Sequence, residues 1–366
     1  MGNLWILLSA YNAAMAERRH DANGLADSAR EVYDAVSAVV SPVYLVGGSV
    51  RDALLGRESG DFDFTTPLDP DTIEARVRAA GRRPYLVGKK FGTVAFKVEG
   101  QTVEVTTFRT EVYPADTRKP RVEFVSELAE DLSRRDFTIN AMALAGDELI
   151  DLHGGCDDLA ARTIRAVGDA RERFAEDPLR MLRAARFSSQ LGFGVEPVTI
   201  DATQRLAHRI LAVARERWVA ELDKLLVGPS ATEGLRLLAE TGLLRYLLPE
   251  LQLQVGYDQN SRYHDRTLWE HTLGVVEATP PDVTLRWAAL LHDVAKPYMR
   301  VEKPGRSTYV RHDLLGAEIV ERTALYLKWG NKRREDVKRL VATHMLAENP
   351  LRAADDSAKP PQLASE

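Results

Sequence analysis

The pattern of hydrophobic residues changes at about residue 169, and this change limits what the chain can fold into. Before it, short runs that alternate apolar and polar residues, as strands do, are interspersed with runs of helical spacing. After it, strand patterns end, and apolar residues recur at helical intervals between glycine or proline stops. We therefore expect an α/β domain with a mixed sheet and flanking helices, followed by all-α domains.

Length, charge and cysteine content narrow the class of protein. The 366 residues suffice for roughly two or three domains. A formal net charge of −5 gives no overall basic surface, so RNA binding would depend on local basic patches. The single cysteine, Cys156, excludes an internal disulfide and fits a reducing compartment, which we expect to be the cytoplasm. The N-terminal apolar run is too short to span a bilayer, so we expect an amphipathic arm and no membrane partner.

A glycine-rich turn near residue 47 has the features of a phosphate-binding site. PVYLVGG predicts a strand that ends at Gly47 and Gly48, and the helix that follows carries Ser49 and Arg51. Glycines at a strand-to-helix turn let backbone N–H groups approach a phosphate, and a guanidinium adds a fixed positive charge.

Further along, LAEDLSRRDFTINAMAL, residues 128–144, predicts another helix before a last strand or hairpin.

Two aspartates on one strand indicate a metal site. In GDFDFTT, Asp61 and Asp63 share a face because side chains alternate along a strand. Adjacent carboxylates repel each other unless a cation lies between them, and Mg²⁺ prefers such oxygen ligands. Glu104, on the strand candidate TVEVTTF, is either a third catalytic carboxylate or an ordinary exposed glutamate. In this order, the turn and the D-x-D strand predict nucleotidyl transfer with two metal ions.

The segment EDPLRMLRAARF, residues 176–187, predicts a helix with charges on one face. Asp177, Arg180 and Arg183 recur at steps of three. One interpretation is a surface helix with ion pairs of about 0.2–0.5 kcal/mol each. In the other, an Asp/Arg pair selects cytosine and adenine. A carboxylate accepts from their exocyclic amino group, and a guanidinium donates to ring nitrogen or carbonyl acceptors.

Five motifs together resemble those of one enzyme family. GGSVRD, GDFDFTT, VEVTTFR, RRDFTINAMAL and EDPLRMLRAARF occur in the order found in bacterial class II tRNA nucleotidyltransferases. These are the CCA-adding enzymes, relatives of bacterial poly(A) polymerases. The resemblance implies a polymerase-β-like nucleotidyltransferase head with a helical neck, body and tail. It also implies Mg²⁺-dependent, template-independent addition of CCA, from CTP and ATP, to the 3′ end of tRNA.

The resemblance also implies roles for individual residues. Asp61 and Asp63 would hold Mg²⁺, and Asp177 with Arg180 would act as an amino-acid template that pairs with CTP or ATP. The other expected nucleotide-binding residues are Gly47, Gly48, Ser49, Arg51, Arg134, Arg135, Asp136, Asn140, Arg183 and Arg186.

Poly(A) synthesis and CC-only addition are the closest alternatives. LVGKKF, residues 86–91, resembles a basic motif of poly(A) polymerases, whereas the following GTVAFKVEG is more similar to the CCA-adding group. The loop YPADTRKPRVEF resembles the flexible loop of enzymes that add the complete CCA, and CC-only enzymes tend to lack it. These features favour complete CCA addition.

Histidines gather in the last helical region. His264, His271, His292-Asp293, His312 and His344 fall there, and imidazoles with carboxylates are good ligands for Mn²⁺, Fe, Ni²⁺ or Zn²⁺. The pattern resembles the HD phosphohydrolase domain, which implies a second divalent transition metal at His271, His292 and Asp293. No convincing terminal aspartate follows His344, so a remnant that only holds tRNA is the alternative. A metal-dependent phosphohydrolase and a non-catalytic RNA-binding protein are the hypotheses from other classes.

These patterns divide the chain into four parts. We predict the catalytic head over residues 1–155 and a helical neck with the nucleotide-selecting helix over 156–225. A helical body follows over 226–346, with the HD-like domain from about 262. The segment 347–366 is polar and proline-bearing, and we expect it to lack fixed structure.

Overall fold

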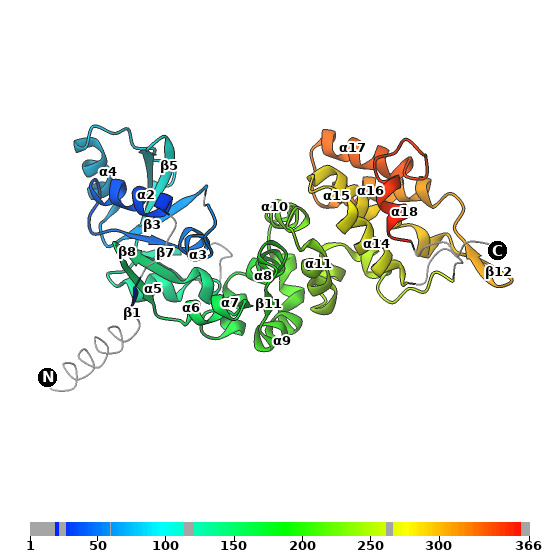
Figure 1. Cartoon of the computed structure of the whole chain (residues 1–366), viewed down its shortest axis with the longest axis horizontal. Helices are drawn as coiled ribbons and strands as arrows, with labels where there is room; N and C mark the ends of the chain where they lie inside the picture. Colours follow the sequence, from blue (N-terminus) through cyan, green and yellow to red (C-terminus); the bar gives the residue numbers. More distant parts are fainter. Residues whose placement is uncertain (1–18, 22–26, 59, 113–120, 261–265, 360–366) are drawn as a thin grey trace. The chain divides into compact units, whose positions relative to one another are not determined.

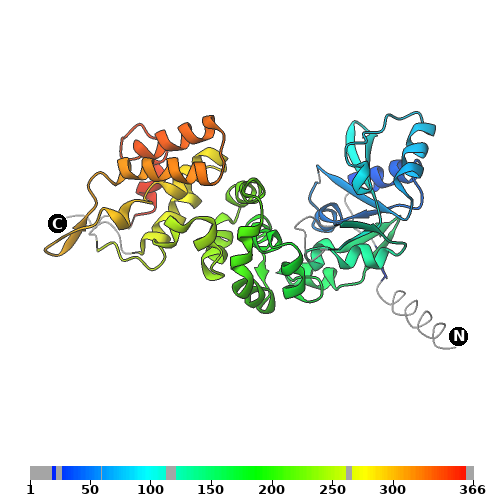
Figure 2. The ribbon, with the colours of Figure 1, turned by 180° about the vertical axis from the view of Figure 1, so that it is seen from behind.

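The computed structural model describes residues 19–21, 27–58, 60–112, 121–260 and 266–359. The predicted N-terminal arm, most of the loop YPADTRKPRVEF and His264 lie outside these ranges. The chain divides into two compact units, residues 1–176 and 177–366. Figure 1 and Figure 2 show the elements of each unit, and the two units are described separately.

The first unit is built on a seven-stranded mixed sheet, as expected. Its order is β1-β9-β8-β2-β3-β5-β4, with β3 and β5 parallel and the other described pairs antiparallel. The strands are β1 Arg19–Asp21, β2 Tyr44–Val46, β3 Phe62–Thr66, β4 Thr93–Val98, β5 Gln101–Thr107, β8 Met142–Ala145 and β9 Glu148–Asp151. A separate hairpin joins β6 Arg109–Val112 to β7 Arg121–Phe124, and β10 is Thr163–Ile164.

Helices flank this sheet. They are α2 Asp27–Ser37, α3 Gly48–Leu54, α4 Pro70–Ala79, α5 Leu128–Ser133, α6 Gly155–Ala160 and α7 Ala170–Glu176, with 3₁₀ turns η1 Lys89–Phe91 and η2 Thr138–Asn140. The helix predicted over 128–144 is wrong beyond Ser133, because the chain there turns through η2 into strand β8. Met142, Ala143 and Leu144 are all buried, so a strand covered on both faces gives a continuous apolar run without alternation.

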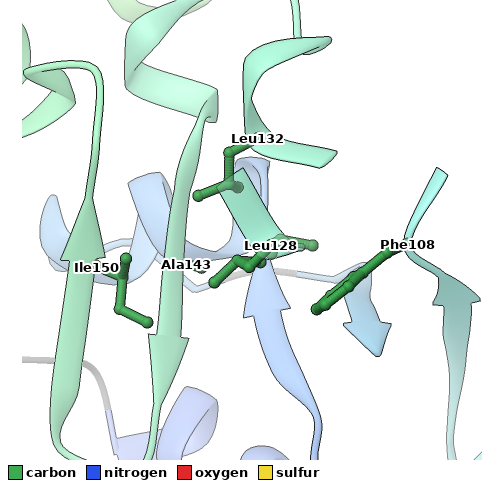
Figure 3. Packing of buried hydrophobic residues seen from close by; sticks show 6 residues of the cluster. Phe108, Leu128, Leu132, Ala143 and Ile150 are labelled. Atoms are coloured by element: carbon green, nitrogen blue, oxygen red, sulfur yellow. The ribbon is translucent and has the colours of Figure 1, made fainter. Parts of the chain in front are cut away.

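A buried cluster fixes α5 against the sheet. Leu128 and Leu132, one helical turn apart, pack with Val46, Ala143 and Ile150, and Phe108 closes one side (Figure 3). This packing matters for the candidate site because Asp131 lies on the same short helix, and Arg134 and Arg135 follow it directly.

The second unit consists mainly of helices. They are α8 Leu179–Leu191, α9 Pro197–Leu206, η3 Ala207–Ala212, α10 Arg215–Leu226, α11 Ala231–Glu240, α12 Leu244–Leu247, α13 Pro249–Gln252, α14 Leu268–Ala278, α15 Val283–Leu291, η4 Lys296–Tyr298, α16 His312–Tyr326, α17 Asn331–Ala342 and α18 Arg352–Ser357. The expectation of no further strands is wrong in detail. β11 is Gly194–Val195, and β12 Val301–Lys303 pairs with β13 Arg306–Thr308. Strands this short carry too few residues to give an alternating pattern.

Helix α8 is packed closely by α10 and α11. Gly234 permits the approach of α11, since a Cβ atom there would lie 2.7 Å from the carbonyl oxygen of Ala185 on α8. The helix predicted to run through residues 176–187 is interrupted, because α7 ends at Glu176 and α8 begins at Leu179. Pro178 has no N–H group to continue the helical hydrogen bonds of α7.

The expected lack of structure over 347–366 is wrong for residues 347–359. Helix α18 lies there against α14, with Leu351, Ala354 and Asp355 buried. The two apolar side chains Leu351 and Ala354 are enough to hold the short helix α18 against α14. They are too few to give a recognisable helical pattern among the polar residues around them. Residues 360–366 lie outside the described part.

The packing of α5 gives a prediction about stability. We expect Leu132→Ala to lower the free energy of unfolding of the head by about 2–5 kcal/mol, because it leaves a cavity beneath α5. Chemical denaturation followed by circular dichroism measures this change. Glu130→Ala, at an exposed position of the same helix, is the matched control and should change stability by less than about 0.5 kcal/mol. Equal effects of the two changes would contradict this account of the core.

Candidate active site and candidate metal centre

The two aspartates of the D-x-D motif lie at the start of β3. Phe62 and Phe64 are buried at 2% and 1% exposure, whereas Asp61 and Asp63 are exposed. This is the division that the alternation predicts, although β3 itself begins only at Phe62. The strand therefore anchors the motif by its phenylalanines and presents its carboxylates.

Glu104 lies beside Asp63. The parallel pairing of β3 and β5 places these two residues in direct register, so their side chains project from the same face of the sheet. Glu104 is exposed as well. The oxygens of Asp61, Asp63 and Glu104 are not all within 4.8 Å of one another, so this set is more open than the histidine cluster described below.

The electrostatic surroundings of Asp63 favour a bound cation. Although the residue is exposed overall, loss of hydration around the carboxyl raises the pKa of Asp63 above its ordinary value, and Asp61 raises it further. The guanidinium of Arg135 opposes this rise. The two carboxylates are a donor set of hard oxygens that fits Mg²⁺, since a divalent cation would relieve their repulsion.

The Gly47–Gly48 turn lies next to these carboxylates. Gly47 has a φ of 78°, in the left-handed region, and a Cβ atom there would lie 3.1 Å from Arg135 Nη1 and 4.0 Å from Asp63 Oδ2. Glycine thus lets the backbone approach both charged groups. Ser49 is buried, and its hydroxyl donates to the Val46 carbonyl at 3.0 Å, so in this structure it stabilises the turn.

A second group of predicted residues forms one hydrogen-bonded network. Arg51 is 8% exposed and donates from Nη1 to Asn140 Oδ1 at 2.7 Å. Asn140 in turn donates from Nδ2 to Asp136 Oδ1 at 3.1 Å. The structure therefore brings Arg51, Asp136 and Asn140 together from α3 and the segment around η2, although 89 positions separate Arg51 from Asn140.

Asp131 is a residue of this site that the sequence analysis missed. It is fully buried and accepts from Arg134 at 2.8 Å and from Arg135 at 3.2 Å. Burial alone would raise the pKa of Asp131, but Arg135 and Arg134 together hold it below its ordinary value. An acid three and four residues before an Arg-Arg pair on a helix was the available signal. Its role is to orient both guanidinium groups.

Asp177 precedes α8 and is held in place at both carboxylate oxygens. Oδ1 accepts from the Leu179 amide at 3.1 Å, and Oδ2 accepts from Arg217 Nη2 at 2.8 Å. Arg180, in the first turn of α8, is only 8% exposed. A buried arginine does not fit the interpretation of a solvated surface helix.

The two later arginines of α8 share a carboxylate from α10. Glu221 lies 2.9 Å from Arg186 and 3.8 Å from Arg183, and Arg186 also lies over the ring of Phe187 at 4.0 Å. Arg217 and Glu221 were not predicted, because they lie on another helix more than thirty positions away. Glu221 thus fixes the direction of the Arg186 guanidinium.

Six buried side chains of the second unit form a cluster. They come from α14, the end of α15, the start of α16, the segment after α17, and α18, which appear in yellow to red in Figure 2. They are His271, His292, Asp293, His312, His344 and Asp355, each at most 7% exposed. Asp355 is the terminal aspartate that the sequence analysis did not find.

The cluster has the chemistry of a metal centre. The Nε2 atoms of His271 and His292 lie 3.4 and 3.0 Å from Asp293 Oδ2, and Asp355 Oδ1 lies 3.1 Å from His271 Nε2. Burial and the neighbouring His292 lower the pKa of His344 to about 4, so that ring is neutral at physiological pH. Burial alone would raise the pKa of Asp293, but His292 and Lys296 keep this carboxyl well below its ordinary range. Imidazole nitrogens and ionised carboxylates are donors that fit a divalent transition metal.

Neither unit contains a membrane-spanning element in its described residues, since none of their helices combines the length and apolar character needed to cross a bilayer.

Three known domain families match successive parts of the chain. Residues 43–165 match the Poly A polymerase head domain, and residues 192–254 match the probable RNA and SrmB-binding site of polymerase A. Residues 268–362 match the HD domain. The last match includes His271, His292, Asp293 and Asp355.

Individual proteins match longer stretches of this chain than any one of these domain families does. A CCA-adding enzyme of Bacillus velezensis is 44% identical over 218 residues, which are 59% of this chain and 53% of that protein. The chain thus spans about half the length of this curated relative.

Two solved structures cover most of the chain. One is a tRNA-processing enzyme with CTP, which is 25% identical with a TM-score of 0.55 and covers 83% of this chain and 74% of its own. The other is the Bacillus stearothermophilus CCA-adding enzyme in complex with CTP, 30% identical with a TM-score of 0.62. This match covers 91% of the present chain and 80% of the solved one. Because the chain is 30% identical to this enzyme and covers 80% of it, the chain belongs to the CCA-adding enzyme family.

Proposed function

We propose that this chain adds CCA to the 3′ end of tRNA by Mg²⁺-dependent nucleotidyl transfer from CTP and ATP. The observation that carries the proposal is the set of groups around Gly47. Asp63 and Glu104 project from one sheet face, and Arg135 lies beside the turn. Membership of the CCA-adding family and the relative solved with CTP support the nucleotide class. A cytoplasmic location stays a prediction.

The carboxylates and arginines of the head have separate tasks in this proposal. Asp61 and Asp63 hold Mg²⁺, which when bound neutralises charge on the reacting phosphates. Glu104 accepts the proton of the attacking 3′-hydroxyl. Arg135, oriented by Asp131, and the backbone of the Gly47–Gly48 turn bind the triphosphate. The 3′-oxygen bonds to the α-phosphorus, the bond to the β-phosphate breaks, and the nucleoside monophosphate is thereby added while pyrophosphate leaves.

Base selection is assigned to Asp177 and Arg180. The carboxylate of Asp177 accepts from an exocyclic amino group, and the guanidinium of Arg180 donates to a ring acceptor. Arg217 holds Asp177 at 2.8 Å, which limits its rotation before a base arrives. This pairing favours CTP and ATP over UTP and GTP. Complete CCA addition, as opposed to CC-only or poly(A) addition, stays a prediction, because most of the loop that favours it lies outside the described residues.

A second activity, metal-dependent hydrolysis of phosphate esters, is favoured by Asp355. With this residue, His271, His292 and Asp293 supply four candidate ligands in a segment that matches the HD domain. The four residues would hold a divalent transition metal, which polarises a phosphate ester and activates water. Lys296, with Nζ 2.6 Å from Asp293 Oδ2, adds a positive charge beside this carboxylate.

Loss of a metal ligand in the head should stop transfer. We expect Asp63→Asn to reduce incorporation by about a thousandfold, because metal-borne charge stabilisation is worth several kcal/mol. The assay follows labelled CTP and ATP on a tRNA that lacks its CCA end. Asp147→Asn, at an exposed aspartate in the turn between β8 and β9, is the matched control and should retain activity. Undiminished transfer by Asp63→Asn, or long oligo(A) products from the unaltered chain, would contradict the proposal.

Loss of the selecting arginine should change nucleotide choice more than rate. We expect Arg180→Ala to reduce discrimination against UTP and GTP by about 10- to 100-fold, because a bidentate base contact contributes about 1–3 kcal/mol. Single-nucleotide extension with each of the four triphosphates measures this ratio. Arg205→Ala removes an exposed arginine of the same unit and should leave the ratio unchanged. Abolished transfer with intact selectivity would refute the templating role.

The hydrolytic activity should depend on α18 and not on the head. We expect Asp355→Asn to abolish turnover of a phosphomonoester in the presence of Mn²⁺ or Ni²⁺, while CCA addition continues. Asp356→Asn, the adjacent and more exposed aspartate, is the control. Should the unaltered chain fail to hydrolyse phosphomonoesters and phosphodiesters with any of these metals, this second activity would be ruled out.

A further inference from the structure

Helix α6 packs directly against the turn η2, which carries Asn140 of the candidate nucleotide site. Gly155, the first residue of α6, is buried. A Cβ atom there would overlap the carbonyl oxygen of Thr138 and would lie 2.9 Å from Met142 Cγ. Glycine is therefore needed for the helix to approach the backbone of η2 this closely. The position of η2 thus depends on the position of α6.

Asp151 fixes the start of α6. This residue is 3% exposed, and its carboxylate accepts from the amides of Gly155 at 2.9 Å and Cys156 at 2.8 Å. Amides in the first turn of a helix have no partner within the helix, so a side-chain acceptor stabilises them. Asp151 is the last residue of β9. The end of α6 that contacts η2 is therefore attached to the sheet.

A buried hydrogen bond joins the next turn of α6 to η2. The hydroxyl of Thr138 donates to Asp158 Oδ2 at 2.6 Å, and the two residues are 2% and 5% exposed. Nε of Arg165 donates to the same oxygen at 3.0 Å. The backbone N–H of Thr138 donates to the Arg165 carbonyl at 2.9 Å, which closes the set. We call Asp158, Thr138 and Arg165 the α6–η2 clamp.

The turn held by this clamp contacts the arginine of the phosphate-binding turn. Asn140, two residues after Thr138 in η2, accepts from Arg51 Nη1 at 2.7 Å. Asp52 accepts from Nε and Nη2 of Arg51 at 2.9 Å each, but Asp52 lies on the same helix, α3. Asn140 therefore supplies a contact that ties Arg51 to the rest of the first unit. Arg51 lies beside Gly48, where a Cβ atom would be 3.4 Å from Nη2.

We propose that Asp158 is a positioning residue of the nucleotide site, which acts through η2 on Arg51. Hydrogen bonds weaken steeply when donor and acceptor are misaligned, so the Asn140–Arg51 contact requires a fixed η2. Without the bond between Thr138 and Asp158, η2 can shift, and a triphosphate meets a less ordered guanidinium. The identity of the ligand rests on the proposed function, whereas the inference concerns nucleotide binding and not the transfer step.

Equilibrium binding of CTP to the full chain, with Mg²⁺ and without tRNA, tests the proposal. We expect Thr138→Val, which removes the hydroxyl at nearly constant volume, to raise the dissociation constant of CTP about tenfold, as loss of a hydrogen bond to a charged group does. Thr138→Ser keeps the hydroxyl and should bind within about twofold of the unaltered chain. Asp157→Ala, at the adjacent exposed position of α6, is the matched control and should leave the constant unchanged.

Asp158→Ala removes the same contact from the side of α6. It should raise the dissociation constant by a similar factor, and combining it with Thr138→Val should add little, because both changes break one interaction. The kcat of CCA addition at saturating nucleotide should fall much less than the affinity. A group that orients the bound triphosphate acts on the ground state and the transition state alike.

Melting temperatures separate positioning from a purely structural role. A lower melting temperature of Thr138→Val and Asp158→Ala, with an unchanged dissociation constant of CTP, would assign the clamp to stability alone and overturn the proposal. Weak binding by Thr138→Ser, equal to that of Thr138→Val, would also contradict it. Clamp-dependent binding of CTP by a chain that never extends tRNA would refute the proposed transfer and support this inference. An unaltered chain that binds no CTP would refute both.

Discussion

A buried charge must be matched by an opposite charge or by hydrogen bonds, and both units are organised by this constraint. In the head, fully buried Asp131 binds Arg134 and Arg135, and thereby fixes the direction of the arginine that lies beside Gly47. In the second unit, Glu221 does the same for Arg186. The cost of burying each acid is offset by the guanidinium groups of these arginines, which the proposed chemistry needs in a fixed position.

The two candidate metal sites differ in the way that their ligands are exposed. The head presents oxygen ligands on an open sheet face, where a hydrated, hard cation can enter together with a triphosphate. The helical unit encloses imidazoles and carboxylates that are at most 7% exposed. Softer ions that give up their water more readily suit such a site. The two donor sets therefore suit different classes of metal ion.

Local patterns predicted the parts of the fold that depend on neighbouring residues. The division of Phe62 and Phe64 from Asp61 and Asp63 follows from strand alternation alone, and the Gly47–Gly48 turn follows from the residues around it. The prediction of a helix through Met142 failed because a strand buried on both faces does not alternate.

The residues that sequence reasoning missed are those whose partners are distant. Arg217 contacts Asp177 across 40 positions, and Asp355 reaches His271 from a helix whose composition suggests disorder. Asp131 was near enough to detect, yet its importance appears only when the buried face of α5 is known. Charge pairs of this kind depend on tertiary packing, which a single sequence does not record.

The position of Asp355 on α18 has a consequence for the order in which the protein matures. The ligands of the centre are spread from α14 to α18, so synthesis delivers His271 first and Asp355 last. The four-ligand set cannot close while α18 is still within the ribosome. The head, whose candidate ligands all precede residue 105, has no such dependence. Metal loading of the proposed centre would therefore follow the synthesis of α18.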